Sequence, residues 1–374
     1  MTDWKKIRGE FAALENWTYL NTATFGQVPR RAKEAMVCHL ARRDRFACVD
    51  FIEWFDDADG MRASIAQLIH AMPDDIAFIL NASAGFSLLL GGLDWKPGDQ
   101  IITLEDEFPN QYYYPNFLGE RGVEFIETPF ERFYESVTER TRLVAISMLN
   151  YSTGFRPPLA EMARFLKERG VLLYLDGTQG LGALELDVSS IRPDMLSVDA
   201  YKWMLAPNGA GFMYVEPSLR ERLRPSVIGW RSDRRWRDFE NLHHGAPEFG
   251  NKAEKYEGGM LAFAPLYGMA ASIAMMLEIG PREIEQRVLQ LATMTRAVLR
   301  RAGGVSPASH EGSPIVTARF EGHDARELAR ELNARNVLVA ARHGNLRVSP
   351  HFYNDESDLE RFDEALRDAV HLSR

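Results

Sequence analysis

Three side chains between residues 172 and 207 combine the residue types and the spacing that catalysis or ligand binding would need. Asp176 ends an apolar run that reads as a buried strand, and ligands of open α/β sheets bind at the carboxyl ends of strands. Gln179 lies three residues further on, and Lys202 follows the next expected strand among apolar neighbours. A lysine is rarely buried without a role, and a buried amine is suited to base chemistry. A turn or helix-capping role for Asp176 and a surface position for Lys202 are the alternatives.

The elements around these residues alternate between strands and helices, which favours a mostly parallel sheet covered by helices on both faces. The run 171–175 is so apolar that both of its faces must be buried. Pro29, the turn at 96–99 and Gly170 mark the ends of elements. We expect strands at 76–80, 100–104, 143–147, 171–175, 195–198 and 211–215, and helices at 30–46, 83–90 and 159–169.

The second half of the chain has a different pattern. Residues 220–237 hold seven Arg and little periodicity, which predicts a loop. Because single cores stop growing beyond about 250–300 residues, we expect a large domain at 16–259 and a small one at 260–374. Residues 1–15 are expected to form a helix that packs on the small domain. Further elements are expected as helices at 263–277, 282–302, 324–335 and 356–369, and as strands at 315–320, 337–340 and 346–349.

Composition and charge exclude several classes of protein. Of the 374 residues, 45% are hydrophobic and 26% are charged, as in ordinary globular domains. The net charge of −9 argues against a partner nucleic acid held by bulk charge. Cys38 and Cys48 are too few for a disulfide scaffold. The first ten residues lack an apolar run, and the uncharged stretch 262–277 is shorter than a membrane span. We therefore expect a cytoplasmic protein without membrane contact.

Three weaker signals point to other functions. His243–His244 could bind a metal, but no carboxylate or Cys is spaced to complete the site, so no metal is expected. Gly180-Leu-Gly182 follows a strand yet lacks the third glycine of a dinucleotide fingerprint. The Arg-rich loop is expected to be solvated or to contact another subunit, and a rim that recognises an acidic side chain is a second option.

Four motifs lie in a fixed order along nearly the whole chain. They are Tyr19-Leu-Asn-Thr-Ala-Thr-Phe-Gly26, Asp176-Gly-Thr-Gln179, Asp199-Ala-Tyr-Lys202 and Arg347-Val-Ser-Pro-His-Phe-Tyr-Asn354. In their order and spacing they resemble the class V aminotransferase family, which includes cysteine desulfurases and kynureninase. The resemblance implies a pyridoxal 5'-phosphate (PLP) enzyme of fold type I. Its α/β large domain would hold a mostly parallel seven-stranded sheet between helices, and a smaller α+β domain would follow.

The resemblance also implies how the cofactor is held. The Lys202 amine would form a Schiff base with the PLP aldehyde, and Asp176 would keep the pyridine nitrogen protonated, which makes the ring an electron sink. Gln179 would donate a hydrogen bond to the ring hydroxyl oxygen. Ser83 matches the hydroxyl that binds the phosphate at a helix start, with N–H groups from Ala82 and Ala84. The alternative for Ser83 is a plain N-cap.

Other family positions are expected around the cofactor ring. Phe108 falls where desulfurases carry a His, and its ring would stack on the cofactor unless it merely packs in the core. Asp199 and Tyr201 precede the lysine, and the Tyr201 hydroxyl could reach the phosphate. Asn150 matches the strand end that contacts the ring, although counting does not decide between Asn150 and Tyr151.

Three departures from the family pattern bear on function. Cysteine desulfurases need a nucleophilic Cys, and here no Cys follows Cys48, so the corresponding loop offers only His343. Met260 stands where the family has the Thr of a Gly-Thr pair that touches the neighbouring subunit's phosphate. Asp199 replaces a Ser and would repel a phosphate placed close to it.

We therefore expect a PLP-dependent aminotransferase that acts on the α-carbon of an amino acid. Arg347 would hold the substrate carboxylate through two parallel hydrogen bonds, with the backbone around Thr24 opposite. A lyase that expels a β-substituent, or an amino-acid epimerase, is the alternative on the same scaffold. A protein of this fold that only binds ligands and a Rossmann oxidoreductase are less consistent with the motifs. The segment 255–259, which in the family reaches into a neighbour's site, implies a homodimer.

Overall fold

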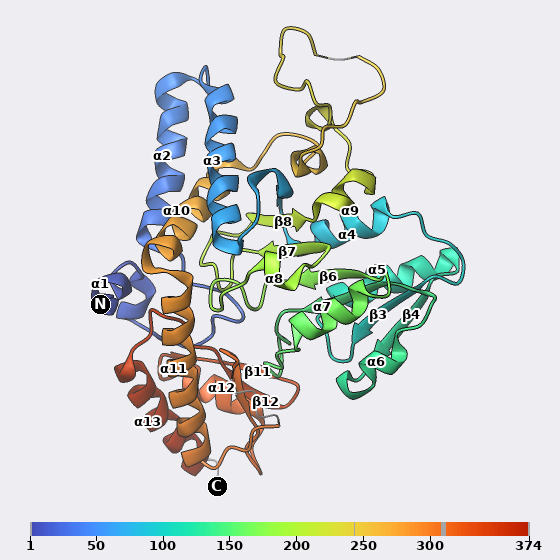
Figure 1. The fold of residues 1–374 in the computed structure, drawn as a ribbon. Coiled ribbons are helices and arrows are strands. Elements are labelled where there is room, and N and C mark those ends of the chain that lie inside the picture. The colour runs from blue at the N-terminus through green and yellow to red at the C-terminus, as the bar shows by residue number, and fades with distance from the viewer. Residues whose placement is uncertain (1, 243, 308–311, 373–374) are drawn as a thin grey trace.

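A seven-stranded sheet forms the centre of the computed structural model, which describes residues 2–242, 244–307 and 312–372 (Figure 1). Five neighbouring strands are parallel, and β8 runs antiparallel to both of its neighbours. The predicted mostly parallel sheet is thereby confirmed. Its spatial order is β2 (Ile76–Ile79), β8 (Gly211–Val215), β7 (Met195–Asp199), β6 (Leu172–Asp176), β5 (Thr141–Ser147), β3 (Gln100–Leu104) and β4 (Glu124–Thr128).

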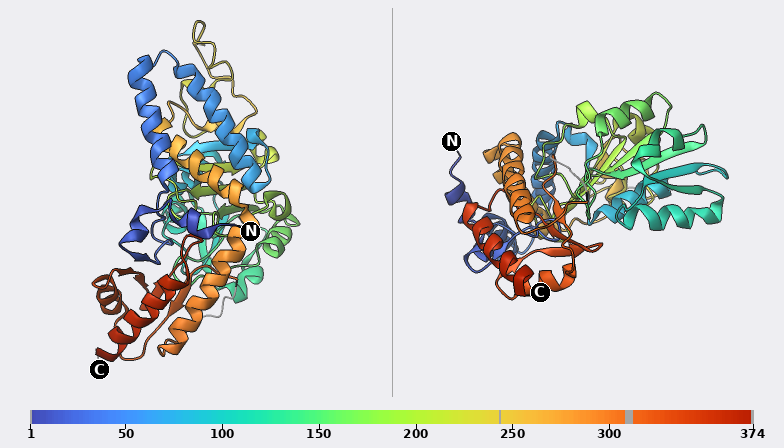
Figure 2. Two further views of the ribbon diagram at one scale, coloured as in Figure 1. Left: turned by 90° about the vertical axis from the view of Figure 1, so that its left-hand side faces the viewer. Right: turned by 90° about the horizontal axis from the view of Figure 1, so that it is seen from below.

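Both faces of the sheet are buried, because successive strand residues point to opposite faces. On one face Tyr174 of β6 stacks on Phe86 of α4 (Ala82–Gly92). On the other face Leu173 packs in the cluster that contains Ile65 of α3 (Phe51–Ile69). Helices therefore lie on both sides of the sheet, as the apolar run at 171–175 predicts (Figure 2). Shorter helices are α5 (Asn110–Phe117), α6 (Phe133–Ser136), α7 (Leu159–Lys167), α8 (Val188–Ile191) and α9 (Pro217–Arg222).

The parallel strands end at one edge of the sheet, and their last residues are polar. Ser147 at the end of β5 pairs in register with Asp176 at the end of β6, and Asp176 pairs with Ser197 of β7. Asp199 ends β7. Three carboxyl- or hydroxyl-bearing strand ends are thus adjacent, as expected for a ligand site of an α/β sheet.

Three long helices form one side of the molecule, and a fourth continues from them. Helix α10 (Phe263–Ile279) packs against α2 (Arg30–Phe46) and α3 (Figure 1). The sequence interpretation missed α3, although its buried residues recur every three to four positions. Helix α11 (Pro281–Arg301) follows Gly280. Within the described residues no single helix is long and apolar enough to cross a membrane, although α10 and α11, bent by 85°, pass that test as a pair.

The C-terminal part contains a three-stranded antiparallel sheet, in the order β11 (Ala340–Arg342), β12 (Asn345–Val348) and β9 (Val316–Ala318). The single strand predicted at 337–340 is divided in two. Its first half, β10 (Val337–Leu338), pairs instead with β1 (Thr18–Tyr19) from the start of the chain, a partner that local sequence cannot reveal. Helices α12 (Ala325–Asn333) and α13 (Glu356–Leu372) complete this part.

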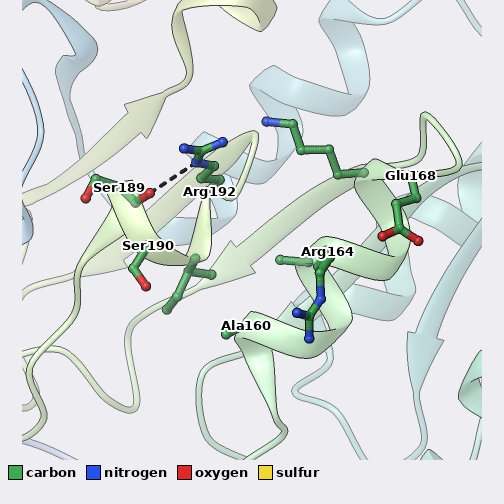
Figure 3. A pocket seen from close by; sticks show the side chains of 9 residues that line it. Ala160, Arg164, Glu168, Ser189, Ser190 and Arg192 are labelled. Carbon is green, nitrogen blue, oxygen red and sulfur yellow. Dashed lines mark hydrogen bonds between the residues drawn. The ribbon is translucent and has the colours of Figure 1, made fainter.

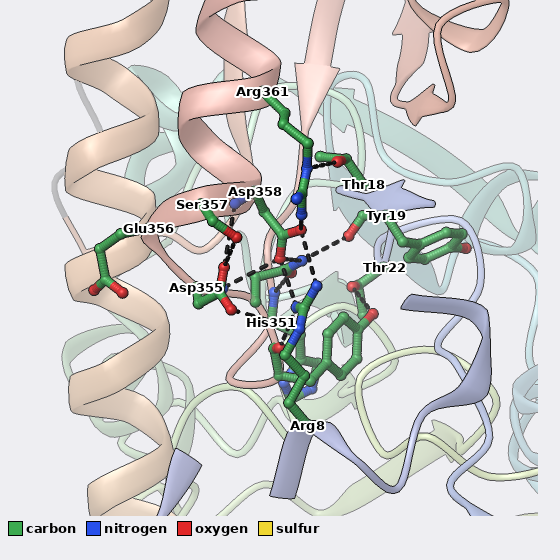
Figure 4. Close-up of polar contacts among 12 residues, drawn as sticks. Arg8, Thr18, Tyr19, Thr22, His351, Asp355, Glu356, Ser357, Asp358 and Arg361 are labelled. Carbon is green, nitrogen blue, oxygen red and sulfur yellow. Dashed lines mark hydrogen bonds and ion pairs between the residues drawn. The ribbon is translucent and has the colours of Figure 1, made fainter. Parts of the chain in front are cut away.

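The first fifteen residues form α1 (Trp4–Arg8) and a separate 3₁₀ helix rather than one helix. Arg8 donates to both carboxylate oxygens of Asp358, at 2.6 and 3.1 Å, and to the Tyr353 carbonyl (Figure 4). Arg361 donates to the Thr18 hydroxyl. The domain limits at 16–259 and 260–374 stay a prediction. The 3₁₀ helices are Ala12–Glu15, Pro73–Asp75, Leu118–Arg121, Phe130–Arg132, Trp230–Ser232 and Ala253–Tyr256.

Candidate active site

A cavity with an empty volume of about 400 Å³ opens at the carboxyl ends of β5, β6 and β7. Eight of the predicted site residues line it, and they come from four separate segments of the chain: Ala82, Ser83, Phe108, Asp176, Gln179, Asp199, Tyr201 and Lys202. Asn110, Ser147, Tyr151 and Thr178 complete the lining.

Lys202 lines this cavity and is only 8% exposed. Burial lowers the pKa of its amine to about 8, although Asp176 opposes that shift. The Lys202 Nζ lies 5.4 Å from the centre of the Phe108 ring and 5.5 Å from that of Tyr201. Gly26 fits beside the lysine because a Cβ there would lie 1.9 Å from the Lys202 carbonyl oxygen. Lys202 is therefore a buried amine that can lose its proton near neutral pH.

Asp176 and Gln179 are held in fixed positions beside Lys202. The Asp176 Oδ1 accepts a hydrogen bond of 2.9 Å from the Thr178 N–H. Gln179 donates from Nε2 to the Ala23 carbonyl, and its Oε1 accepts from the Trp203 indole at 3.0 Å. A buried carboxylate and a buried amine that line the same cavity fit the pyridine ring expected from the sequence.

The start of α4 forms one end of the cavity. Ser83 Oγ donates to the Asn110 side chain at 2.6 Å, so its hydroxyl is already oriented across the cavity. The Ala84 N–H donates to Asn81, the N-cap residue, and Ala84 does not line the cavity. Of the three residues predicted at the phosphate, Ala82 and Ser83 line this end.

Asp199 lies at the same end of the cavity. Burial, together with the nearby Asp176 carboxylate, raises the pKa of Asp199 to about 6, and a hydrogen bond from the Ala82 N–H opposes the shift. The Asp199 carboxyl group therefore accepts the hydrogen bond of the Ala82 N–H, which a phosphate would otherwise accept. Protonated Asp199 could donate to a phosphate oxygen, whereas the ionised form would repel it.

Tyr151, and not Asn150, lines the cavity. The Asn150 side chain bonds to backbone groups of two loops: its Oδ1 accepts from the N–H groups of Ser152 and Thr153 in its own loop, and its Nδ2 donates to the Asp106 carbonyl in another. The predicted contact of Asn150 with the cofactor ring has no support in this arrangement. The Tyr151 ring packs edge-on against Phe108, at 5.3 Å between centres.

Arg347 and Thr24 lie beside the cavity rather than in its wall. Arg347 is 1% exposed, and it donates to the Tyr151 carbonyl and to the Thr24 hydroxyl, both at 2.6 Å. Burial lowers the pKa of the guanidinium to about 9. The two residues predicted to bind the substrate carboxylate are therefore in contact with each other, although more than 300 positions separate them in the chain.

Glu107 is a functional candidate that the sequence did not single out. It is fully buried, and desolvation raises its pKa to about 7. Its carboxyl oxygens accept from the Ser147 N–H at 2.7 Å and from the Ser147 hydroxyl at 2.5 Å, and Ser147 neighbours Asp176 in the sheet. In the sequence Glu107 stands in an acidic run beside Glu105 and Asp106, and nothing there distinguishes it.

A larger surface pocket lies away from this chemistry. A surface pocket of about 1020 Å³ between α7 and α8 is lined by side chains that precede β6 and β7, such as Arg164 and Arg192 (Figure 3). No group of three or more His, Cys, Asp or Glu side chains in the described residues could hold a metal. His243 of the predicted pair lies outside those residues.

The Arg-rich segment at 220–237 forms ion pairs with carboxylates of other segments instead of being fully solvated. Arg231 is buried and donates to Glu257 at 2.7 Å and to Glu254 at 3.2 Å. Arg237 pairs with two carboxylates of α3. The expectation of a solvated loop is therefore wrong for Arg231, whereas Arg237 is exposed although it pairs with these carboxylates.

Known protein families and proteins resemble this chain over most of its length. The family model "Aminotransferase class-V" matches residues 52–362. The chain is 27% identical to an isopenicillin N epimerase of Streptomyces clavuligerus, over 98% of each chain. It is 24% identical to a probable cysteine desulfurase of Methanothermobacter thermautotrophicus, over 97% of each chain.

Solved structures show the same fold. A mutant of C-DES, with glycine covalently linked to its PLP cofactor, has a TM-score of 0.88 at 22% identity, over 96% of this chain and 99% of that one. The apo cysteine desulfurase of Thermococcus onnurineus NA1 has a TM-score of 0.89 at 19% identity, over 99% of each chain. The fold-type-I architecture is therefore confirmed. Because the family model covers most of the chain, the chain belongs to the class V aminotransferase family, a family of PLP-dependent enzymes.

Proposed function

We propose that this enzyme is an aminotransferase that uses PLP held by Lys202 and acts at the α-carbon of an amino acid. The observation that carries the proposal is the buried Lys202 amine, which has a lowered pKa of about 8 and shares with Asp176 a cavity suited to proton transfer near neutral pH. Covalent amine chemistry needs such an unprotonated lysine.

In the proposed reaction the residues in and beside the cavity have separate roles. PLP, when bound there, would supply an aldehyde that reacts with amines and an electron sink for the α-carbon. The Lys202 amine would hold the cofactor, and it would then take the α-proton and return it to another carbon, which is general acid–base catalysis. Asp176 and Gln179 would hold the ring, and Phe108 would cover it. Arg347 would bind the substrate carboxylate.

Transfer of an amino group is favoured over desulfuration because neither thiol of the chain lines the cavity. Cys38 is exposed on α2, and Cys48 follows that helix. The C-terminal loop beside the site presents His343, whose Nε2 lies 2.9 Å from the Tyr151 hydroxyl. Neither atom can carry a persulfide as a thiolate does.

Replacing both cysteines by serine is therefore expected to leave turnover and the visible absorbance of the cofactor essentially unchanged. Steady-state kinetics of wild-type and Cys38→Ser/Cys48→Ser protein measure this directly. If activity is lost while the fold and the yellow colour persist, a cysteine takes part in the reaction and desulfuration returns as the leading function.

Epimerisation is the second candidate, and the Tyr151–His343 pair favours it. Inversion at the α-carbon needs a second group to deliver a proton from the face opposite Lys202. Tyr151 lines the cavity beside Phe108, and its hydroxyl is hydrogen-bonded to His343. The relative from Streptomyces clavuligerus is named for such a reaction. A lyase remains the third outcome, since the same carbanion can expel a β-substituent.

A screen of the holoenzyme with amino acids, alone and with a keto acid, separates these reactions. Transamination predicts a new amino acid that forms only when the keto acid is present. Appearance of the opposite enantiomer without a keto acid would indicate epimerisation. Pyruvate and ammonia without a keto acid would contradict transamination and indicate a lyase.

We also propose that the enzyme is a homodimer with the sites at the subunit interface. Large apolar side chains stand exposed near the cavity, among them Phe25, Leu80 and Phe108, and Met260 is also exposed. Covering such side chains is favourable. Light scattering at micromolar concentration is expected to give about twice the chain mass of 42.5 kDa. A fully active monomer would refute this.

A further inference from the structure

Two arginines beside the cavity share one face of the β11–β12 hairpin. Arg347 of β12 pairs in register with Ala340 of β11, and Arg342 lies two residues further along β11. Residues two apart on a strand point to the same face. Both guanidinium groups reach the Thr24 hydroxyl, Arg347 at 2.6 Å and Arg342 at 3.5 Å. The hairpin thus brings two positive charges to one neutral oxygen atom.

No carboxylate neutralises either arginine in the described part of the chain. Arg347 donates only to the Thr24 hydroxyl and the Tyr151 carbonyl, and its buried Nε has no partner. Arg342 donates to its neighbour's carbonyl, at Ala341, and to Thr24. Like charges on neighbouring strand positions are destabilising, and a buried charge without a counterion is costly. The arrangement is that of a site that binds anions.

Both charges are close enough to act on the reacting group. Arg347 and Arg342 each lower the pKa of Lys202, and each acts on the Tyr151 hydroxyl. The two arginines differ in exposure: Arg347 is buried and bonded to the Tyr151 carbonyl, whereas Arg342 is half-buried and precedes the exposed His343, which is hydrogen-bonded to the Tyr151 hydroxyl. One α-carboxylate can neutralise only one of them.

We propose that the substrate is an amino acid with a second acidic group, held by Arg342 while Arg347 holds the α-carboxylate. This inference rests on the proposed function, since it presumes an amino acid in the cavity. In this proposal Arg342 selects substrates by their side chains. Substrates with an acidic side chain are accepted, whereas neutral ones leave the positive charge of Arg342 without a counterion.

Binding of simple carboxylates to the holoenzyme tests this without any turnover. Succinate and butyrate have the same chain length and differ by one carboxylate. By calorimetry at constant ionic strength, succinate is expected to bind at least about tenfold more tightly, since a hydrogen bond to a charged group contributes on that order. Equal affinities would overturn the proposal.

Two variants of Arg342 test whether this residue binds the second carboxylate of succinate. Arg342→Gln is expected to abolish the preference for succinate while leaving butyrate affinity unchanged, and Arg342→Lys to retain part of it. Arg319→Gln is the matched control, because Arg319 is exposed beside Gly344 of the same hairpin, and it should bind both acids like wild type. If Arg342→Gln weakens butyrate as much as succinate, both arginines hold one carboxylate and the proposal is wrong. Failure of the proposed transamination would show only in the product screen, whereas these affinities would be unaffected.

Discussion

Replacing Lys202 by alanine is expected to lower kcat by at least about a thousandfold, because general acid–base catalysis and covalent attachment of the cofactor are lost together. Lys202→Arg should be equally inactive, since a guanidinium keeps the charge but does not release its proton near neutral pH. The measurement is single-turnover and steady-state kinetics on the substrate found in the product screen. The absorbance of cofactor linked to lysine should disappear with the activity.

A matched control separates this effect from a general loss of lysine charge. Lys167 lines the surface pocket between α7 and α8, away from the cavity. Lys167→Ala should therefore keep wild-type turnover and colour. Activity of Lys202→Ala above a few per cent of wild type would mean that another group moves the α-proton.

Replacing Asp176 by asparagine is expected to lower kcat about a hundredfold or more, because a fixed charge aimed at the site of charge development is lost. Asp194→Asn is the matched control. Asp194 is a half-buried carboxylate whose pKa burial raises, but it accepts from the Leu173 N–H near the opposite ends of the same strands. A wild-type kcat for Asp176→Asn would show that the ring is not activated from this side.

The same variant should change how the apoenzyme takes up the cofactor as the pH varies. Only the unprotonated Lys202 amine can attack an aldehyde, so uptake of PLP should accelerate as the pH rises through about 8, the lowered pKa of Lys202. Asp176 raises that pKa, and its removal should therefore move the midpoint to lower pH. Stopped-flow absorbance follows uptake without any turnover.

Six of the seven strands of the central sheet could be predicted from local sequence, whereas the edge strand β4 was missed because most of its residues are exposed or half-buried and carry no continuous apolar run. The run Val171–Leu175 is continuous and apolar, and such a run is stable only when both faces are covered. Its end at Asp176 and the spacing to Lys202 then place both side chains at one edge. Asp176, Gln179 and Lys202 could be found in this way, whereas the other five predicted residues that line the cavity rest on the resemblance to the family.

The direction of individual side chains and the pairing of segments that are distant in the chain could not be predicted from local sequence. Asn150 and Tyr151 are adjacent in the sequence. The conformation of their loop directs the Asn150 side chain to the N–H groups of the next residues, whereas Tyr151 lines the cavity. Glu107 becomes notable only when β5 brings Ser147 against it. Arg342 comes to lie on the same face as Arg347 through the register of β11 with β12. The strand predicted at 337–340 does not include residue 342, so this register could not be predicted.

Reduction of the holoenzyme with borohydride, followed by peptide mapping, tests the central claim most directly. Borohydride fixes the cofactor on the amine that holds it, so a single modified peptide is expected, with the label on Lys202. The label should be absent from Lys202→Ala protein treated in the same way. Recovery of the label on another lysine, such as the buried Lys255, or a holoenzyme that yields no labelled peptide, would contradict the account.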